Sequence, residues 1–493
     1  MAKKSSSISS TYKVYGIGIA LFWGISLKAV ISTHVPVDAP TYDDIDILEA
    51  YQCAQATYRG LRPQSHDDLR SALALFENQK EKCEAPEWLL AEREILISPL
   101  LPAQFSVGVG LRNEESISLP GLDAEVTPNF PMRHGRPDFF GPNLWGEASV
   151  SGAVGQNFGL ALSATPGGVV ALEDSATFQG KAYLQEWNVK LGVGRWEVSA
   201  GRTALQVGGP KHGALLLSQG TKPLKLWKMA LRPSFPLDGS SAFLGPFALE
   251  TWFADAGDSA IGISGSKFWA IGLGARPFSF FEFSLLQLYQ WGGVGAPTLN
   301  AKEILSMLYY SSDPELETKR QRQLLLDVAF WAPRHWVKGY GQILFGPLRF
   351  SEETGYLAGL WFPRLGGWEA RIEYVTLGRL AYTHPVWTQG MSYEMTPLGH
   401  PIGPGGQAIY VDLGFPVWDG TRTALGAFYE ARGEHRIEPA EFRVGGTVGL
   451  AKRWERLSLL FSGRYASIQN LFYQNGEKKQ AFSFWATMIY SAF

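Results

Sequence analysis

The chain has 493 residues, a net charge of −2 and only 18% charged residues, so it lacks the basic surface of a general nucleic-acid-binding protein. Mean hydropathy is close to zero, which excludes a bundle of ordinary membrane helices. Aromatic residues reach 13%, and every tryptophan except Trp23 and Trp88 follows residue 140. This balance is typical of a β-barrel, in which half of each strand faces lipid and half faces water.

Residues 1–29 are expected to form a secretory signal peptide. Lys3 and Lys4 precede an apolar run of 14 residues from Val14 to Leu27. Such a run is too short to cross a bilayer comfortably, so cleavage is favoured over anchoring. We expect cleavage near residue 29 or as late as residue 39.

A small periplasmic α-helical domain is expected over residues 40–98. Thr41 to Asp44 resembles a capping box, and Ile47, Tyr51, Ala54 and Tyr58 then recur at helical spacing. A second helix is expected between Ser65 and Pro86, and a third over 87–97. These helices would cover the periplasmic mouth of the β-barrel that the rest of the chain is expected to form.

Cys53 and Cys83 both fall in this helical segment. An oxidising periplasm favours a disulfide between them. In a simple hairpin turning near Arg62, however, they would lie roughly 18 Å apart along the helix axis, so a bond requires a kink or a third helix that folds back. Two unpaired core cysteines are the alternative.

After Pro102 the hydrophobic period changes to that of a β-strand. Ala370, Ile372 and Tyr374, for example, alternate with Glu369, Arg371 and Glu373. The pattern predicts an all-β transmembrane β-barrel of about 18 antiparallel strands over residues 102–493, with its charged side facing a wet lumen. The expected strands are 102–111, 142–153, 157–164, 179–190, 194–203, 224–234, 242–254, 266–275, 280–291, 322–332, 338–347, 356–363, 367–377, 406–415, 421–431, 441–452, 456–467 and 481–493.

The connections between these strands indicate an orientation. They are short on one side, as in 364–366, and long on the other, as in 204–223 and 378–405. Long loops of such barrels are extracellular, so we expect an outer-membrane protein with both termini in the periplasm. The last strand ends in Phe493 and is expected to engage the barrel-assembly machinery, although a soluble protein that ends in a strand would look similar.

Two of the long connections hold the least ordinary sequence. One runs from Gly209 and Pro210 through Gly213 to Ser218, and the other is Leu398-Gly399-His400-Pro401-Ile402-Gly403. Read as residues alone, both are structured loops rich in turn formers. Together they resemble the capsule-assembly Wzi family, in which a Gly-Pro-x-x-Gly stretch follows a strand ending in Gly-Arg and a Leu-Gly-His-Pro-x-Gly element comes later. The resemblance covers about residues 100–493.

The resemblance implies an outer-membrane barrel of about 18 strands with periplasmic helices. It also implies a lectin-like role, in which the protein binds and retains capsular or exported polysaccharide at the cell surface. The chain departs from the family at Gln206-Val207, where a tryptophan pair is common, and at Phe345-Gly346, where an acidic pair is common.

Candidate polysaccharide-binding residues follow from the loops and from the family motif. They are Arg202, Lys211, His212, Trp387, Tyr393 and His400. Aromatic faces stack on sugar rings and cations pair with acidic sugars, whereas packing within loops or in a membrane girdle is the alternative. Residues expected to hold the loop shapes are Gly209, Pro210, Gly213, Ser218, Gly399 and Gly403.

A sugar-selective or general diffusion porin is the alternative function, since about 18 strands also suit a pore. The N-terminal helices, which could plug the barrel, favour the binding role. Ser-His-Asp arrangements, metal-ligand spacings and cofactor motifs do not stand out, so we expect no enzyme activity, no metal and no cofactor. The expected partners are polysaccharide and outer-membrane lipid, and no nucleic acid.

Overall fold

The computed structural model describes residues 41–51, 54, 58–64, 103–113, 116–120, 122, 124–126, 141–154, 158–174, 177–193, 195–231, 243–257, 262–307, 314–332, 336–346, 350–418, 421–434, 436–454 and 456–492. The expected signal peptide, Cys53, Cys83 and the helices expected over 65–97 lie outside these residues, so those expectations stay predictions.

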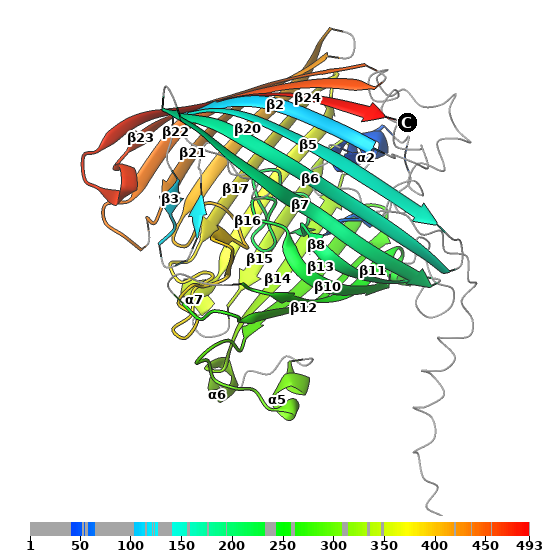
Figure 1. Ribbon diagram of the computed structural model, residues 1–493, viewed down its shortest axis with the longest axis vertical. Coiled ribbons are helices and arrows are strands. Elements are labelled where there is room, and N and C mark those ends of the chain that lie inside the picture. Colours follow the sequence, from blue (N-terminus) through cyan, green and yellow to red (C-terminus); the bar gives the residue numbers. More distant parts are fainter. Residues whose placement is uncertain are drawn as a thin grey trace, which may run out of the picture.

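Eighteen strands of the described chain form one closed antiparallel barrel (Figure 1). Each pairs with the next barrel strand along the chain, and β24 pairs with β2 to close the wall. The barrel strands are β2 (Ala103–Arg112), β5 (Gly141–Val154), β6 (Phe158–Asp174), β7 (Thr177–Val193), β8 (Trp196–Thr203), β10 (Leu224–Leu231), β11 (Phe247–Asp255), β12 (Lys267–Phe278), β13 (Phe281–Trp291), β14 (Arg320–Trp331), β15 (Lys338–Phe345), β16 (Gly355–Leu365), β17 (Trp368–Leu377), β20 (Gln407–Trp418), β21 (Thr421–Arg432), β22 (Glu441–Arg453), β23 (Leu457–Gln469) and β24 (Lys478–Ala492).

The predicted fold class is confirmed, and each expected strand has a counterpart. The largest difference is the strand expected over 157–164, which continues as β6 to Asp174. Pro166 does not end it, because the pairing with β7 shifts register between Thr165 and Pro166. Such an irregularity accommodates a residue that lacks a backbone N–H.

The barrel wall is apolar on its outer side. Ile372 and Tyr374 of β17 are exposed there, whereas Arg371 and Glu373 are buried on the lumen side. The expected alternation is therefore present. The expectation of a wet lumen is corrected at these two positions, because Arg371 pairs with Asp43 and Glu373 accepts backbone hydrogen bonds from an inserted loop.

The two ends of the barrel differ. One end, the short-turn end, carries turns such as 279–280 and 366–367, and β24 finishes there. The other, the long-loop end, carries loops such as 204–223 and 378–406. The smaller elements are β3 (Ile117–Ser118), β4 (Glu125–Val126), β9 (Gln206–Val207), α5 (Ala301–Ser306), α6 (Pro314–Glu317), α7 (Phe350–Glu353), β18 (Ser392–Tyr393), β19 (Thr396–Pro397) and η4 (Leu471–Tyr473).

The described part of the N-terminal segment lies inside the short-turn end. It comprises α2 (Thr41–Ala50) and β1 (Leu61–Arg62). The helix ends at Ala50, and the described residues Tyr51, Ala54 and Tyr58, which were expected to continue it, are not helical. The Tyr58 hydroxyl lies 2.9 Å from the Ser284 hydroxyl on the lumen face of β13. Among the described residues, no helix is long and apolar enough to cross a bilayer.

Candidate functional site

Loop 204–223, here called the inner loop, enters the lumen. Leu205, Val207 and the run Leu215 to Leu217 are buried in it. Its short strand β9 pairs with β1 of the N-terminal segment, with Val207 opposite Leu61. A leucine run in a loop is favourable when it leaves water, and the lumen supplies the apolar partners.

Wall side chains hold the backbone of the inner loop. The amides of Lys211 and His212 donate to the two carboxylate oxygens of Glu373, at 2.6 and 3.0 Å. On β15, the Gln342 side chain accepts from the Leu215 amide at 2.8 Å and donates to the Val207 carbonyl at 3.0 Å. These bonds satisfy backbone groups that would otherwise be buried and unpaired.

Loop 378–406, here called the cap loop, packs on the inner loop at the long-loop end. The Tyr382 hydroxyl donates to the Leu215 carbonyl at 2.5 Å and accepts from the His400 amide at 3.2 Å. The Ser218 amide donates to the Leu398 carbonyl at 3.0 Å. The two sequence motifs, nearly two hundred residues apart in the chain, thus form one joint.

Glycine is required at the centre of this joint. Gly213 has φ +130, and a Cβ there would lie 2.8 Å from Pro401 Cδ and 2.9 Å from His400 Cδ2. Gly399 lies under the Tyr382 ring, and Gly403, at φ +78, packs against Leu119. Any side chain at Gly213 would push the two loops apart.

His400 supports the joint rather than the outer surface. Its side chain is buried, and Nδ1 accepts from the Ile402 amide at 3.1 Å. Burial lowers the pKa of His400 to about 3. The ring is therefore neutral at physiological pH and offers no charge to an acidic sugar, contrary to the expectation for this residue.

Trp387 and Tyr393 are also internal. They are 0% and 1% exposed. Trp387 Nε1 donates to the Gly292 carbonyl at 3.1 Å, and the Tyr393 hydroxyl accepts from the Lys225 amide at 3.4 Å. A buried ring has no free face for stacking, so the expected sugar contacts of these two residues are corrected to roles in loop packing.

Lys211 and His212 keep accessible side chains, 35% and 17% exposed. Both reach Asp412 on the lumen face of β20: Lys211 Nζ lies 3.1 Å and His212 Nε2 2.7 Å from its carboxylate oxygens. The His212 ring also stacks on Tyr410 with a centroid distance of 4.1 Å. Of the predicted polysaccharide-binding residues, these two present polar groups to the lumen.

Arg202 faces the outside of the barrel. It stands opposite Trp187 and Lys225, which are both exposed on the outer wall. Its Nη2 lies 3.0 Å from Glu394 Oε2 in the cap loop. The structure therefore separates Arg202 from Lys211 and His212, although all three were predicted to bind the same ligand.

The turn before β24 carries an exposed aromatic residue, Phe472, that is not among the candidate polysaccharide-binding residues given above. Asn470, Phe472 and Tyr473 all have φ between +54 and +60 there, a conformation uncommon for residues other than glycine. The Asn470 side chain donates to the Ala440 carbonyl at 2.9 Å, and the Phe472 amide donates to Glu441 at 3.0 Å. Phe472 remains 37% exposed, so the turn presents its ring outward at the long-loop end.

An ion cluster joining the N-terminal segment to the wall was missed as well. In α2, Asp46 pairs with Arg59 at 2.5 Å and with Lys338 of β15 at 2.7 Å, and Glu49 pairs with Arg59 and with Arg276 of β12. Burial raises the pKa of Asp46, but Arg59 and Lys338 outweigh it and hold that pKa below its usual value. Asp46 and Glu49 fall outside the face formed by Ile47, Tyr51, Ala54 and Tyr58, so helical spacing alone predicts that they are exposed, whereas both are buried.

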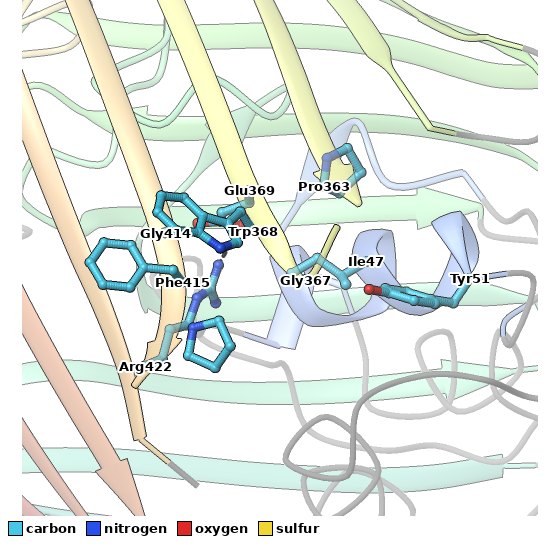
Figure 2. A pocket seen from close by; sticks show the side chains of 10 residues that line it. Ile47, Tyr51, Pro363, Gly367, Trp368, Glu369, Gly414, Phe415 and Arg422 are labelled. Atoms are coloured by element: carbon cyan, nitrogen blue, oxygen red, sulfur yellow. Dashed lines mark ion pairs between the residues drawn. The ribbon is translucent and has the colours of Figure 1, made fainter. Parts of the chain in front are cut away.

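A small cleft opens at the short-turn end, remote from both loops. Figure 2 shows Ile47 of α2 and Tyr51, which follows the helix, facing the turns of the wall, with Trp368 beside Phe415 and an ion pair between Glu369 and Arg422. The Trp368 and Phe415 rings stack with a centroid distance of 4.9 Å. None of the residues predicted to bind polysaccharide lines this cleft.

Comparisons with known proteins agree with this architecture. The solved structure of Wzi from Escherichia coli, described as an outer membrane protein involved in group 1 capsule assembly and as a carbohydrate-binding β-barrel, is similar at a TM-score of 0.68 and 15% identity, covering 94% of this chain and 100% of that one. OpdL and OprD of Pseudomonas aeruginosa are both similar at TM-scores of 0.45, with 11% and 10% identity, covering 80% and 79% of this chain and 99% and 92% of theirs. No curated protein sequence matches the chain. The family model of the capsule assembly protein Wzi matches residues 123–481, and the chain belongs to that family.

Proposed function

We propose that this protein binds capsular or exported polysaccharide and retains it at the cell surface without catalysing a reaction. The family supports the proposal, because its model spans both loop motifs. The observation that carries it is the filled barrel: the N-terminal segment and the inner loop enter the lumen, and the cap loop packs on the inner loop at the long-loop end. Leu215 to Leu217, Ala381, Tyr382 and Leu398 are buried in this packing. A plugged barrel favours a binding role over a diffusion pore.

The proposed orientation places the long-loop end outside the cell and both termini in the periplasm. Long extracellular loops and short periplasmic turns are the rule in such barrels. In this orientation the part of 40–98 beyond the described residues would cover the periplasmic mouth, and β24 would be the strand that the barrel-assembly machinery engages.

Cysteine labelling tests the orientation. In a background with Cys53→Ser and Cys83→Ser, Met395→Cys at the tip of the β18–β19 hairpin should react in whole cells with a membrane-impermeant maleimide. Ser279→Cys, in an exposed turn at the other end, should react only after lysis. The reverse pattern would overturn the orientation.

We propose that Phe472 and the Lys211–His212 pair contribute to sugar contact. Phe472 supports a stacking role because its strained turn holds an aromatic face outward, and strain of this kind concentrates at binding sites. Lys211 and His212 would pair with acidic groups of a segment that enters between the loops.

The deciding experiment is polysaccharide partition in a deletion strain. We expect a normal total amount with a shift from cells to medium, restored by the unaltered chain. Phe472→Ala should restore less retention than Phe280→Ala, a matched exposed phenylalanine at the short-turn end. Unchanged partition would reject surface retention, and single-channel conductance of the purified barrel would then test the porin alternative.

A further inference from the structure

A row of charged side chains crosses the outer wall of β8, β10, β11 and β12, next to the long-loop end. Arg202 stands opposite Lys225, and Asp255 stands opposite Lys267. Leu226 pairs with Ala254, which places Lys225 next to Asp255 across β10 and β11. Lys225 points outward, because β10 alternates exposed Lys225, Trp227 and Met229 with buried neighbours.

The next outward row towards the barrel middle is aromatic. Trp227 pairs with Phe253, and Phe253 pairs with Trp269, whose ring it stacks on at 5.2 Å. Trp227 is 70% exposed. The row after that is Met229, Thr251 and Ile271. Charged, aromatic and mainly aliphatic rows in this order mark the level at which a bilayer passes from headgroups to acyl chains.

The cations in the charged row outnumber the anions that face them. Arg202 lies 3.0 Å from Glu394, and Lys267 lies 2.6 Å from Asp255. Lys222 adds a further ammonium, which donates to the Glu394 carbonyl oxygen at 2.5 Å. Lys225 Nζ is 3.8 Å from Glu394 and its side chain is 63% exposed, so its ammonium is the one most accessible from the membrane side.

We propose that this row is a binding site for the phosphorylated headgroup of an outer-leaflet lipid. Lys225 and Lys267 contact the phosphate, Arg202 reinforces the charge, and the exposed Trp227 packs against the first acyl carbons. The aromatic and aliphatic rows lie directly below the charged row, and binding of a free anion would not need them. The proposed ligand is therefore a lipid rather than free phosphate. The assignment uses the orientation proposed above but not polysaccharide binding.

The test is a lipid titration of the purified full chain in neutral detergent, followed by native mass spectrometry. The probes are lipid A with its two phosphates, the same lipid with its phosphates removed, and inorganic phosphate. Lys225→Gln should weaken lipid A binding about fivefold, and Lys225→Gln with Lys267→Gln more strongly. Lys452→Gln, which removes an outer-wall lysine at the short-turn end, is the matched control and should change binding little.

A second variant keeps the test decisive if the lysine variants fold poorly. Glu394→Gln removes an anion that competes for Arg202 and Lys225, so it should tighten lipid A binding. Equal binding of dephosphorylated lipid, equal affinity for inorganic phosphate, or no difference between Lys225→Gln and Lys452→Gln would each overturn the assignment. A detergent titration does not depend on orientation or polysaccharide, so its failure is distinct from failure of the labelling or partition experiments.

Discussion

Two segments enter the lumen, and different interactions hold them. Charges fix the N-terminal segment, where Asp46 and Glu49 of α2 meet Arg59, Arg276 and Lys338. Wall side chains that bind backbone groups fix the inner loop, together with close packing at glycine. The first arrangement depends on complementary charge and the second on shape, so they should fail under different changes.

The largest expected effect is at Glu49, the carboxylate shared by Arg59 and Arg276. Glu49→Gln leaves two buried guanidinium groups with less compensating charge, which should lower the free energy of unfolding by about 3–5 kcal/mol. Denaturant unfolding of the purified barrel measures it. Arg379→Gln, which breaks an exposed pair with Glu352, should leave the midpoint nearly unchanged. Equal effects of the two variants would contradict a charge-held segment.

Gly213→Ala should disrupt the packing of the inner loop against the cap loop. Its φ of +130 and the clash with Pro401 and His400 predict a loss of about 2–4 kcal/mol. Gly265→Ala separates the two causes, because Gly265 has φ +72 and nothing within 4 Å of an added Cβ. If both variants lost the same stability, the contact between the two motifs would be irrelevant.

Mild acid should distinguish the two regions. His400 stays neutral down to about pH 3, whereas its unfolded form takes a proton near pH 6.5, so its contribution to stability falls by about 1.4 kcal/mol per pH unit between those values. The contribution of Asp44 in α2 changes with pH in the opposite direction. Burial raises the pKa of Asp44 to about 6, so the folded state gains relative stability as pH falls from 6 towards 3.8. Hydrogen exchange at pH 7 and 5, corrected for intrinsic rates, should show protection lost in the cap loop but not in α2. Loss of protection in both the cap loop and α2 would contradict this difference in pH dependence.

Tyr382→Phe should have the smallest effect. It removes the hydroxyl that joins Leu215 to His400 and leaves the ring in place, at a cost of about 1–2 kcal/mol. Thermal unfolding of Tyr382→Phe against the unaltered chain measures it. A cost as large as that of Gly213→Ala would mean that the hydroxyl, rather than the glycine packing, holds the joint.

The barrel could be predicted from the sequence because alternation with period 2 is local. Ile372 and Tyr374 face out and Arg371 and Glu373 face in whatever the rest of the chain does. The roles of the loop residues could not be predicted from the sequence, because Trp387 and His400 look like ligand-binding residues until the packing of the cap loop is known. The outward position of Arg202 was readable in principle, since it continues the parity of Val198, but its place beside two loop motifs suggested a loop residue.

The position of α2 has a consequence for assembly. The N-terminal segment precedes β2, the strand that closes the wall with β24, yet its partners Arg276, Ser284 and Lys338 lie on β12, β13 and β15. A closed wall leaves no lateral gap. The segment must therefore cross the lumen before β2 and β24 meet, or enter later through an open end. In the first case, pairing of β2 with β24 would enclose the N-terminal segment, which could then no longer leave the lumen through the wall.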